Sequence, residues 1–131
     1  MNETPTPNTN TVLIVDDEES LTNVLARKFE DEGITALCAY DGKQGLEMAL
    51  DKHPDVILLD VMMPEMDGFE VLTALKKDEW GKDVPVILLT NSSSIDTVAR
   101  AVSTGMSEFL VKTEMKLDDV VEHVKDRFVK E

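Results

Sequence analysis

Five polar side chains directly follow short apolar runs in four separate parts of the sequence. Such runs, bounded by residues that favour turns, are typical of strands buried on both faces. Open α/β sheets carry their chemistry beyond the carboxyl ends of the strands, which is where these side chains would lie. The five residues are Asp16, Asp17, Asp60, Thr90 and Lys112.

Together these residues supply three carboxylates, one hydroxyl and one ammonium group. Clustered carboxylates repel one another at neutral pH, and a divalent cation would offset that repulsion. Oxygen ligands with positions left for water suit Mg²⁺. Lys112 and Thr90 could then bind phosphoryl oxygens, and Asp60 could accept the phosphoryl group as a nucleophile. The residues therefore predict Mg²⁺-dependent phosphoryl transfer.

Each of these residues, taken alone, also has a plainer explanation. Asp16 and Asp17 precede a predicted helix and could simply stabilise its first turn. Asp60 could begin a turn, Thr90 is a common strand residue, and Lys112 could be an ordinary solvated lysine. The hypothesis of a site rests on their shared placement at the ends of separate predicted strands.

Apolar runs alternate with helical patterns five times along the chain. Strict alternation predicts an α/β fold in which helices cover both faces of a parallel sheet. In the common strand order 2-1-3-4-5, the first and third strands are neighbours and the site lies between them. The expected strands are 11–15, 34–39, 56–59, 84–89 and 109–111.

The fourth predicted helix carries an apolar stripe. A serine within 92–94 can cap its start, and Gly105 closes it. Val98, Ala99 and Val102, together with Ile95, share one face at helical spacing.

Length and charge narrow the classes of function. The 131 residues suit one domain, and residues 1–10 are polar and read as a flexible N-terminal tail. The net charge of −14 disfavours direct binding to nucleic acid or to anionic lipid. No apolar stretch approaches the length of a membrane span, and no secretory signal is present, so we expect a cytoplasmic protein.

The segment from Asp60 to Gly68 carries the most specific signal in the chain. It reads Asp-Val-Met-Met-Pro-Glu-Met-Asp-Gly. With the acidic pair, the threonine and the lysine described above, this segment resembles the receiver domain of bacterial two-component response regulators. The resemblance covers residues 11–131 and implies a flavodoxin-like (βα)5 three-layer sandwich.

The resemblance also implies a role for each residue of the site. Asp60 would accept a phosphoryl group from a phosphohistidine on a sensor histidine kinase or a phosphotransfer protein. Asp17 and Asp60 would bind Mg²⁺ directly, with Asp16 assisting and the backbone carbonyl of Met62 completing the protein ligands. Thr90 and Lys112 would bind the phosphoryl group. Such a domain assists its own phosphorylation but turns over no separate substrate, so we expect no enzyme in the usual sense.

The resemblance further implies a switch. Phe109 matches an aromatic position that turns inward as Thr90 moves toward the phosphate. The face built from the fourth helix, the fifth strand and the fifth helix would then change its affinity for a downstream target protein, or form a dimer on phosphorylation. The chain ends at Glu131, directly after the last predicted helix, so we expect a receiver that acts alone.

The sequence departs from the family pattern near the site. Thr113 follows Lys112 where the family usually has a proline after a cis peptide bond, so that bond is either retained as cis or replaced by trans. Asn91 stands where a small residue is common. Met62 and Ser92 occupy positions that tune attack by water, and neither obviously holds one. We therefore expect the phosphorylated state to be long-lived.

Two other classes of function remain open on the sequence alone. One is a Mg²⁺-dependent phosphohydrolase with Asp60 as the nucleophile, although Met62 stands where many such enzymes place an acid-base catalyst. The other is a protein-binding module that is not phosphorylated. The intact set of site residues argues against that second class.

Overall fold

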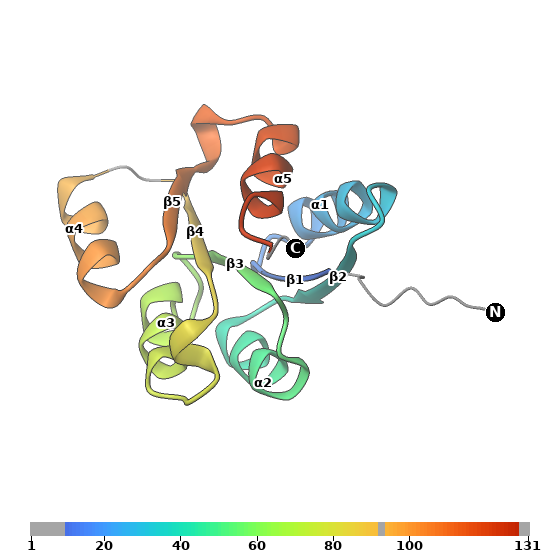
Figure 1. The fold of residues 1–131 in the computed structure, drawn as a ribbon. Coiled ribbons are helices and arrows are strands. Elements are labelled where there is room, and N and C mark those ends of the chain that lie inside the picture. Colours follow the sequence, from blue (N-terminus) through green and yellow to red (C-terminus); the bar gives the residue numbers. More distant parts are fainter. Residues whose placement is uncertain (1–9, 92–93, 129–131) are drawn as a thin grey trace.

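Five parallel strands form one sheet in the order β2-β1-β3-β4-β5. The computed structural model describes residues 10–91 and 94–128, and Figure 1 shows the arrangement of the elements. The predicted α/β fold and its strand order are confirmed. The strands are β1 (Thr11–Val15), β2 (Thr35–Ala39), β3 (Val56–Asp60), β4 (Val86–Thr90) and β5 (Glu108–Val111).

Two helical layers enclose the sheet (Figure 1). One layer packs α1 (Glu19–Asp31) and α5 (Leu117–Lys125) on one face of the sheet. The other packs α2 (Gly42–Lys52), α3 (Gly68–Lys76) and α4 (Ile95–Thr104) on the opposite face. None of the described helices is long and apolar enough to cross a membrane.

The three central strands explain why the apolar runs are continuous rather than alternating. Every residue of β3 and β4 is buried, and in β1 all but the first residue is buried. Both faces of these strands meet helices, so apolar side chains are required on both sides. The edge strand β2 is only partly buried, with Ala39 its one buried residue. The three central strands are therefore firmly packed, and this packing holds their carboxyl ends in place at one edge of the sheet.

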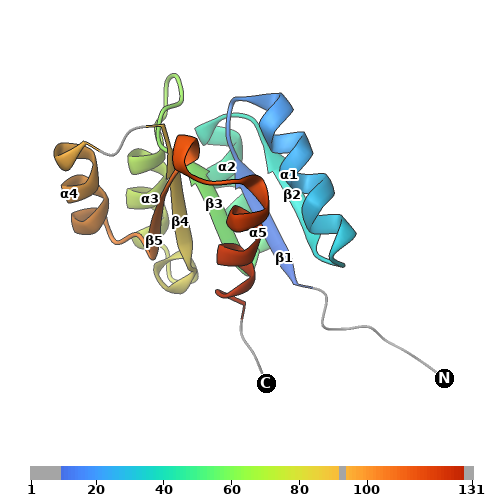
Figure 2. The same cartoon turned by 90° about the horizontal axis from the view of Figure 1, so that it is seen from above.

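The observed strand limits differ slightly from the expected ones. Pro85 lies just before β4 and β4 extends to Thr90, so the expected strand 84–89 is shifted toward the carboxyl end. Asp60 and Thr90 are each the last residue of a strand, whereas Lys112 begins a short 3-10 turn, Lys112–Glu114. Figure 2 shows the loops that follow β1, β3 and β5 at the same edge of the sheet.

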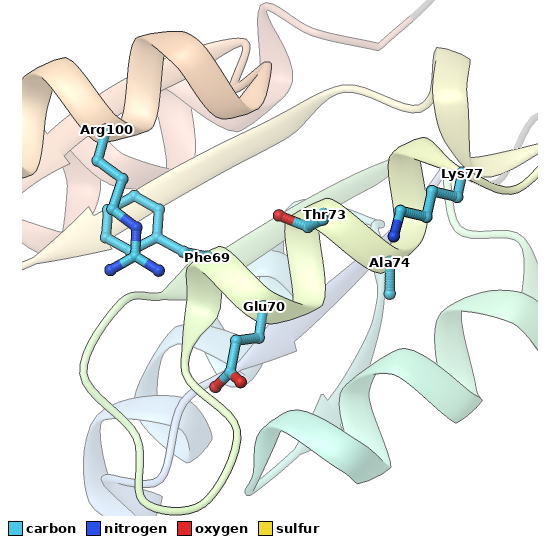
Figure 3. A pocket seen from close by; sticks show the side chains of 6 residues that line it. All are labelled: Phe69, Glu70, Thr73, Ala74, Lys77 and Arg100. Carbon is cyan, nitrogen blue, oxygen red and sulfur yellow. The ribbon is translucent and has the colours of Figure 1, made fainter.

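The apolar stripe of α4 is not buried as a unit: Val98 is partly buried, and the side chain of Ile95 lies outside the described residues. Ala99 is exposed and Val102 is 63% exposed, whereas Ala101, on another side of the helix, is fully buried in the core. Arg100 adds one further attachment, because its guanidinium lies 4.4 Å from the ring centroid of Phe69 on α3. Beside that contact a pocket of about 380 Å³ lies along α3, and Arg100 is the lining residue that comes from α4 (Figure 3). Its lining residues are Phe69, Glu70, Thr73, Ala74, Lys77 and Arg100.

The burial of Ala101 predicts a difference between two identical substitutions on α4. Ala101→Leu should lower the free energy of unfolding by about 1–3 kcal/mol, because the larger side chain overpacks the core. Ala99→Leu, on the exposed side, should change it by less than about 0.5 kcal/mol. Urea denaturation of both variants measures the difference. Equal losses in the two variants would contradict this placement of the helix.

Candidate functional site

Three carboxylates meet beyond the ends of β1 and β3. Asp16 and Asp17 directly follow β1, Asp60 ends β3, and one oxygen from each lies within 4.8 Å of the others. Asp16 and Asp60 are only 2% and 4% exposed, whereas Asp17 is exposed to solvent. The pairing of β1 with β3 brings these residues together, since Val15 lies opposite Leu59 in the parallel register.

Lys112 enters this cluster from the end of β5. Its Nζ lies 2.8 Å from Asp16 Oδ2, 3.5 Å from Asp60 Oδ1 and 3.7 Å from Glu18 Oε1. The peptide bond between Lys112 and Thr113 is trans, which settles the two alternatives that the sequence left open. A trans bond at this place therefore still delivers the ammonium group to the carboxylates.

Thr90, at the end of β4, lies on a strand between the one that carries Asp60 and the one that leads to Lys112. In the parallel register Asp60 is opposite Leu89, and Thr90 is opposite Val111, the residue before Lys112. The Thr90 side chain is fully buried. The strand ends therefore bring a hydroxyl-bearing residue to the same edge as the acids and the lysine.

The loop from β1 to α1 is held by hydrogen bonds that the sequence pattern did not reveal. The amide of Glu18 donates to Asp16 Oδ1 at 2.9 Å, and the amide of Asp16 donates to the carbonyl of Ala39 at 3.1 Å. The hydroxyl of Thr22, a fully buried residue of α1, lies 3.2 Å from the carbonyl oxygen of Asp16. Sequence reasoning missed Thr22 because a single threonine within a helical pattern suggests no particular partner, and only its contacts reveal one.

The loop from β3 to α3 depends on Gly68. A Cβ atom added there would lie 2.3 Å from the carbonyl oxygen of Asp60, so only glycine lets α3 begin against the backbone of that residue. Asp67 caps the helix by accepting from the amide of Glu70, and the Glu70 side chain accepts from the amide of Asp67. The Asp-Gly pair at the end of the sequence motif thus has a local structural role.

The surroundings of Asp60 oppose its ionisation in the absence of metal. Burial raises its pKa, as does the neighbouring Asp16, while Lys112 and a backbone hydrogen bond from Met62 act in the opposite direction. Their sum raises the pKa of Asp60 to about 7. Burial disfavours the charge on Lys112 as well, but the adjacent carboxylates, Asp16 foremost, prevail and raise its pKa.

The donor set fits a hard divalent cation. Asp16 Oδ2 is buried and accepts no hydrogen bond of good geometry among the described residues; its close contact is the ion pair with Lys112. One ammonium group cannot neutralise three carboxylates, so positive charge is still lacking. Carboxylate oxygens together with water are the ligands that Mg²⁺ prefers.

The other residues implied by the resemblance lie around this cluster. Met62 is 67% exposed, and Asn91 is also exposed. Phe109 is partly buried and packs against the core on the side of α2 to α4. Ser92 lies outside the described residues. The serine that caps α4 is Ser94, which accepts a hydrogen bond from the amide of Thr97.

The raised pKa of Asp60 predicts how stability depends on pH without metal. Because folding raises that pKa from 3.8 to about 7, the contribution of Asp60 to stability is present in full below its unfolded pKa and is lost as the pH rises to about 7. We therefore compare the free energy of unfolding of Asp60→Asn with that of the unmodified chain in EDTA. The difference should shift in favour of Asp60→Asn from pH 4 to pH 8, by on the order of 2 kcal/mol.

Urea denaturation at both pH values measures this change. Excess Mg²⁺ should restore stability to the chain that retains Asp60, since the cation offsets the carboxylate repulsion. A difference between the two proteins that is the same at pH 4 and pH 8 would contradict the raised pKa.

Comparisons with known proteins agree with this geometry. The family model for the response regulator receiver domain matches residues 12–125. Response regulator PleD of Caulobacter vibrioides is 40% identical over 110 residues, 84% of this chain and 24% of that protein. Regulatory protein AtoC of Escherichia coli is 37% identical over 103 residues, 79% of this chain and 22% of that protein. The chain spans less than half the length of these curated relatives.

Solved structures resemble the whole fold. The chemotaxis response regulator CheY4 of Vibrio cholerae has a TM-score of 0.85 and 28% identity, covering 92% of this chain and 100% of that one. The receiver domain of Francisella response regulator 1452 has a TM-score of 0.82 and 30% identity, covering 91% and 96%. The residues that the family model matches include all five strands, apart from the first residue of β1, and the complete acidic cluster. The chain therefore belongs to the response regulator receiver domain family.

Proposed function

We propose that Asp60 is the phosphoacceptor of this receiver domain, and that residues 11–131 form the functional unit. The observation that carries the proposal is the buried cluster itself, in which Asp60 lies beside Asp16 with Lys112 contacting both. An oxygen of Asp60 attacks the phosphorus atom of a phosphohistidine on a sensor histidine kinase or a phosphotransfer protein. The phosphorus–nitrogen bond breaks, and the imidazole leaves with a proton from solvent.

The neighbouring residues have separate tasks in that step. Asp16, Asp17 and Asp60, with the backbone carbonyl of Met62, would hold Mg²⁺, which supplies charge neutralisation for the phosphoryl oxygens when bound. Lys112 binds one phosphoryl oxygen after giving up part of its contact with Asp60. Thr90 donates a hydrogen bond to another. Asp60 itself is only 4% exposed, so its interactions with these charges are stronger than they would be in water.

The output of the domain is a change in the face formed by α4, β5 and α5. Thr90 and Phe109 would move together, since β4 and β5 are paired along their length. Two apolar residues of α4, Ala99, which is exposed, and Val102, which is 63% exposed, support this face as the binding surface for a downstream protein. A dimer formed through the same face on phosphorylation is a second form of the same output. In physical terms, phosphorylation would shift the population of the domain between two packings of this face.

The arrangement favours a regulator over an enzyme. An acid-base catalyst beside Asp60 would be needed for turnover of a phosphate ester, and Met62 has no ionisable group. A module that never accepts phosphate would not require three clustered carboxylates and a lysine side chain that is only 11% exposed, because assembling these charges costs free energy. We place the domain in the cytoplasm, where histidine kinases act, and expect no direct contact with nucleic acid because of its net charge of −14.

Phosphorylation by a small donor tests the proposal directly. After incubation with Mg²⁺ and acetyl phosphate, intact mass spectrometry should show one acid-stable, base-labile phosphoryl group. Asp60→Asn and added chelator should each abolish it. Asp67→Asn provides a matched control, because it alters a carboxylate of the same loop that caps α3 and lies outside the cluster. A phosphoryl group that persists in Asp60→Asn, or that never forms, would refute the proposal.

The residues at the mouth of the site predict slow loss of the phosphoryl group. Met62 is apolar and exposed beside Asp60, so it holds no water in line for attack. Met62→Asn places an amide there and should hasten hydrolysis several-fold, whereas Met62→Leu should leave the rate nearly unchanged. The decay of the phosphorylated mass after removal of acetyl phosphate measures both rates. Rapid decay in the unmodified chain, as in a fast chemotaxis regulator, would contradict the expectation.

A further inference from the structure

We propose that Thr22 is a positioning residue for the carboxylates of the β1–α1 loop. The inference rests on the proposed Mg²⁺ site and names a residue of α1 that controls its affinity. Thr22 touches neither the metal position nor the phosphoryl group in this proposal. It acts through the backbone carbonyl of Asp16, to which its hydroxyl donates at 3.2 Å.

Thr22 occupies a position where an apolar residue is expected. It lies on the buried side of α1 with Leu25 and Phe29, at helical spacing, and all three are fully buried. A buried hydroxyl without a partner costs free energy, so its presence on an apolar stripe calls for a specific acceptor. The residue therefore performs a task that valine, of nearly the same shape, would not.

Two acceptors compete for the single hydroxyl proton. One is the carbonyl of Glu18 at 3.1 Å, within the first turn of the helix itself, and the other is the carbonyl of Asp16. The first acceptor already receives a hydrogen bond from the amide of Thr22 at 3.1 Å. Among the described residues, the carbonyl of Asp16 has no other donor. Loss of the hydroxyl would therefore leave this oxygen without a hydrogen bond from those residues.

That carbonyl controls the direction of the next residue. The oxygen of Asp16 belongs to the peptide plane that leads into Asp17, so fixing the oxygen fixes the plane. The side chain of Asp17 is exposed, and the structure gives it no hydrogen bond of its own among the described residues. Its approach to the other two carboxylates therefore depends on the backbone of Asp16 to Glu18. Partners that orient metal ligands commonly change metal affinity by about 10- to 100-fold.

Three variants separate this role from a merely structural one. Thr22→Val removes the hydroxyl and keeps the shape, while Thr22→Ser keeps the hydroxyl. Leu25→Ala perturbs the same buried side of α1 without touching the loop. Isothermal titration with Mg²⁺ gives the dissociation constant of each folded protein, and thermal unfolding in EDTA gives its stability. Asp17→Asn, which removes a proposed ligand, marks the loss of the site itself.

We expect Thr22→Val to raise the dissociation constant for Mg²⁺ about tenfold, and Thr22→Ser to keep it within about twofold of the unmodified chain. Leu25→Ala should lower the melting temperature and leave the dissociation constant unchanged. With acetyl phosphate, Thr22→Val should need about tenfold more Mg²⁺ for half-maximal phosphorylation, yet reach nearly the same rate at saturating Mg²⁺.

The outcomes distinguish this inference from the proposed function. Equal Mg²⁺ affinity in Thr22→Val and the unmodified chain, or an equal loss in Leu25→Ala, would overturn the positioning role and leave the phosphoacceptor site standing. If the unmodified chain shows no Mg²⁺ binding beyond that of Asp17→Asn, both the positioning role of Thr22 and the proposed Mg²⁺-dependent function are overturned.

Discussion

The repulsion among three carboxylates at the end of the sheet is the constraint around which the site is built. Asp16 and Asp60 are buried, Asp17 lies close to both, and the ammonium of Lys112 offsets only part of their charge. A folded chain tolerates such a cluster because the rest of the sheet fixes the strand ends that carry it. The buried strands β1, β3 and β4 hold these strand ends in place. The negative charge of the carboxylates still exceeds the positive charge of Lys112, so the site favours binding of a cation.

Two loops convert this constraint into a definite geometry. On one side, α3 begins against the backbone of Asp60, which is possible only because Gly68 lacks a Cβ atom. On the other side, the amide of Glu18 and the hydroxyl of Thr22 both bind Asp16. The backbone that carries the carboxylates is thus positioned by neighbouring groups that have no proposed contact with the metal or the phosphoryl group. Such support is what allows a site to be preorganised rather than assembled at each encounter with a donor.

Sequence reasoning reached the fold and the strand ends because both depend on patterns that are local in the chain. Continuous apolar runs mark buried parallel strands, and the polar residues that follow Leu59 and Leu89 must lie at their carboxyl ends. It could not reach Thr22, whose role depends on a contact with a backbone atom. It also could not decide the Lys112–Thr113 bond, nor that Ala101 rather than Val102 faces the core, because α4 has apolar residues on more than one side.

The small number of fully buried side chains among those described on α4 gives the proposed signal a physical route. In the proposed mechanism the phosphoryl group adds negative charge at Asp60, and a neutral hydroxyl such as that of Thr90 moves toward it to donate a hydrogen bond. In the same mechanism, movement at the end of β4 would reach β5 through the pairing of Thr90 with Val111, and would reach α4, the next described helix along the chain. Every residue of β4 is buried, whereas among the described side chains of α4 only Ala101 is fully buried, and Arg100 lies over the ring of Phe69. Elements with few buried contacts are those that move in such transitions, so in the proposed mechanism α4 is the element that we expect to respond to added charge at Asp60.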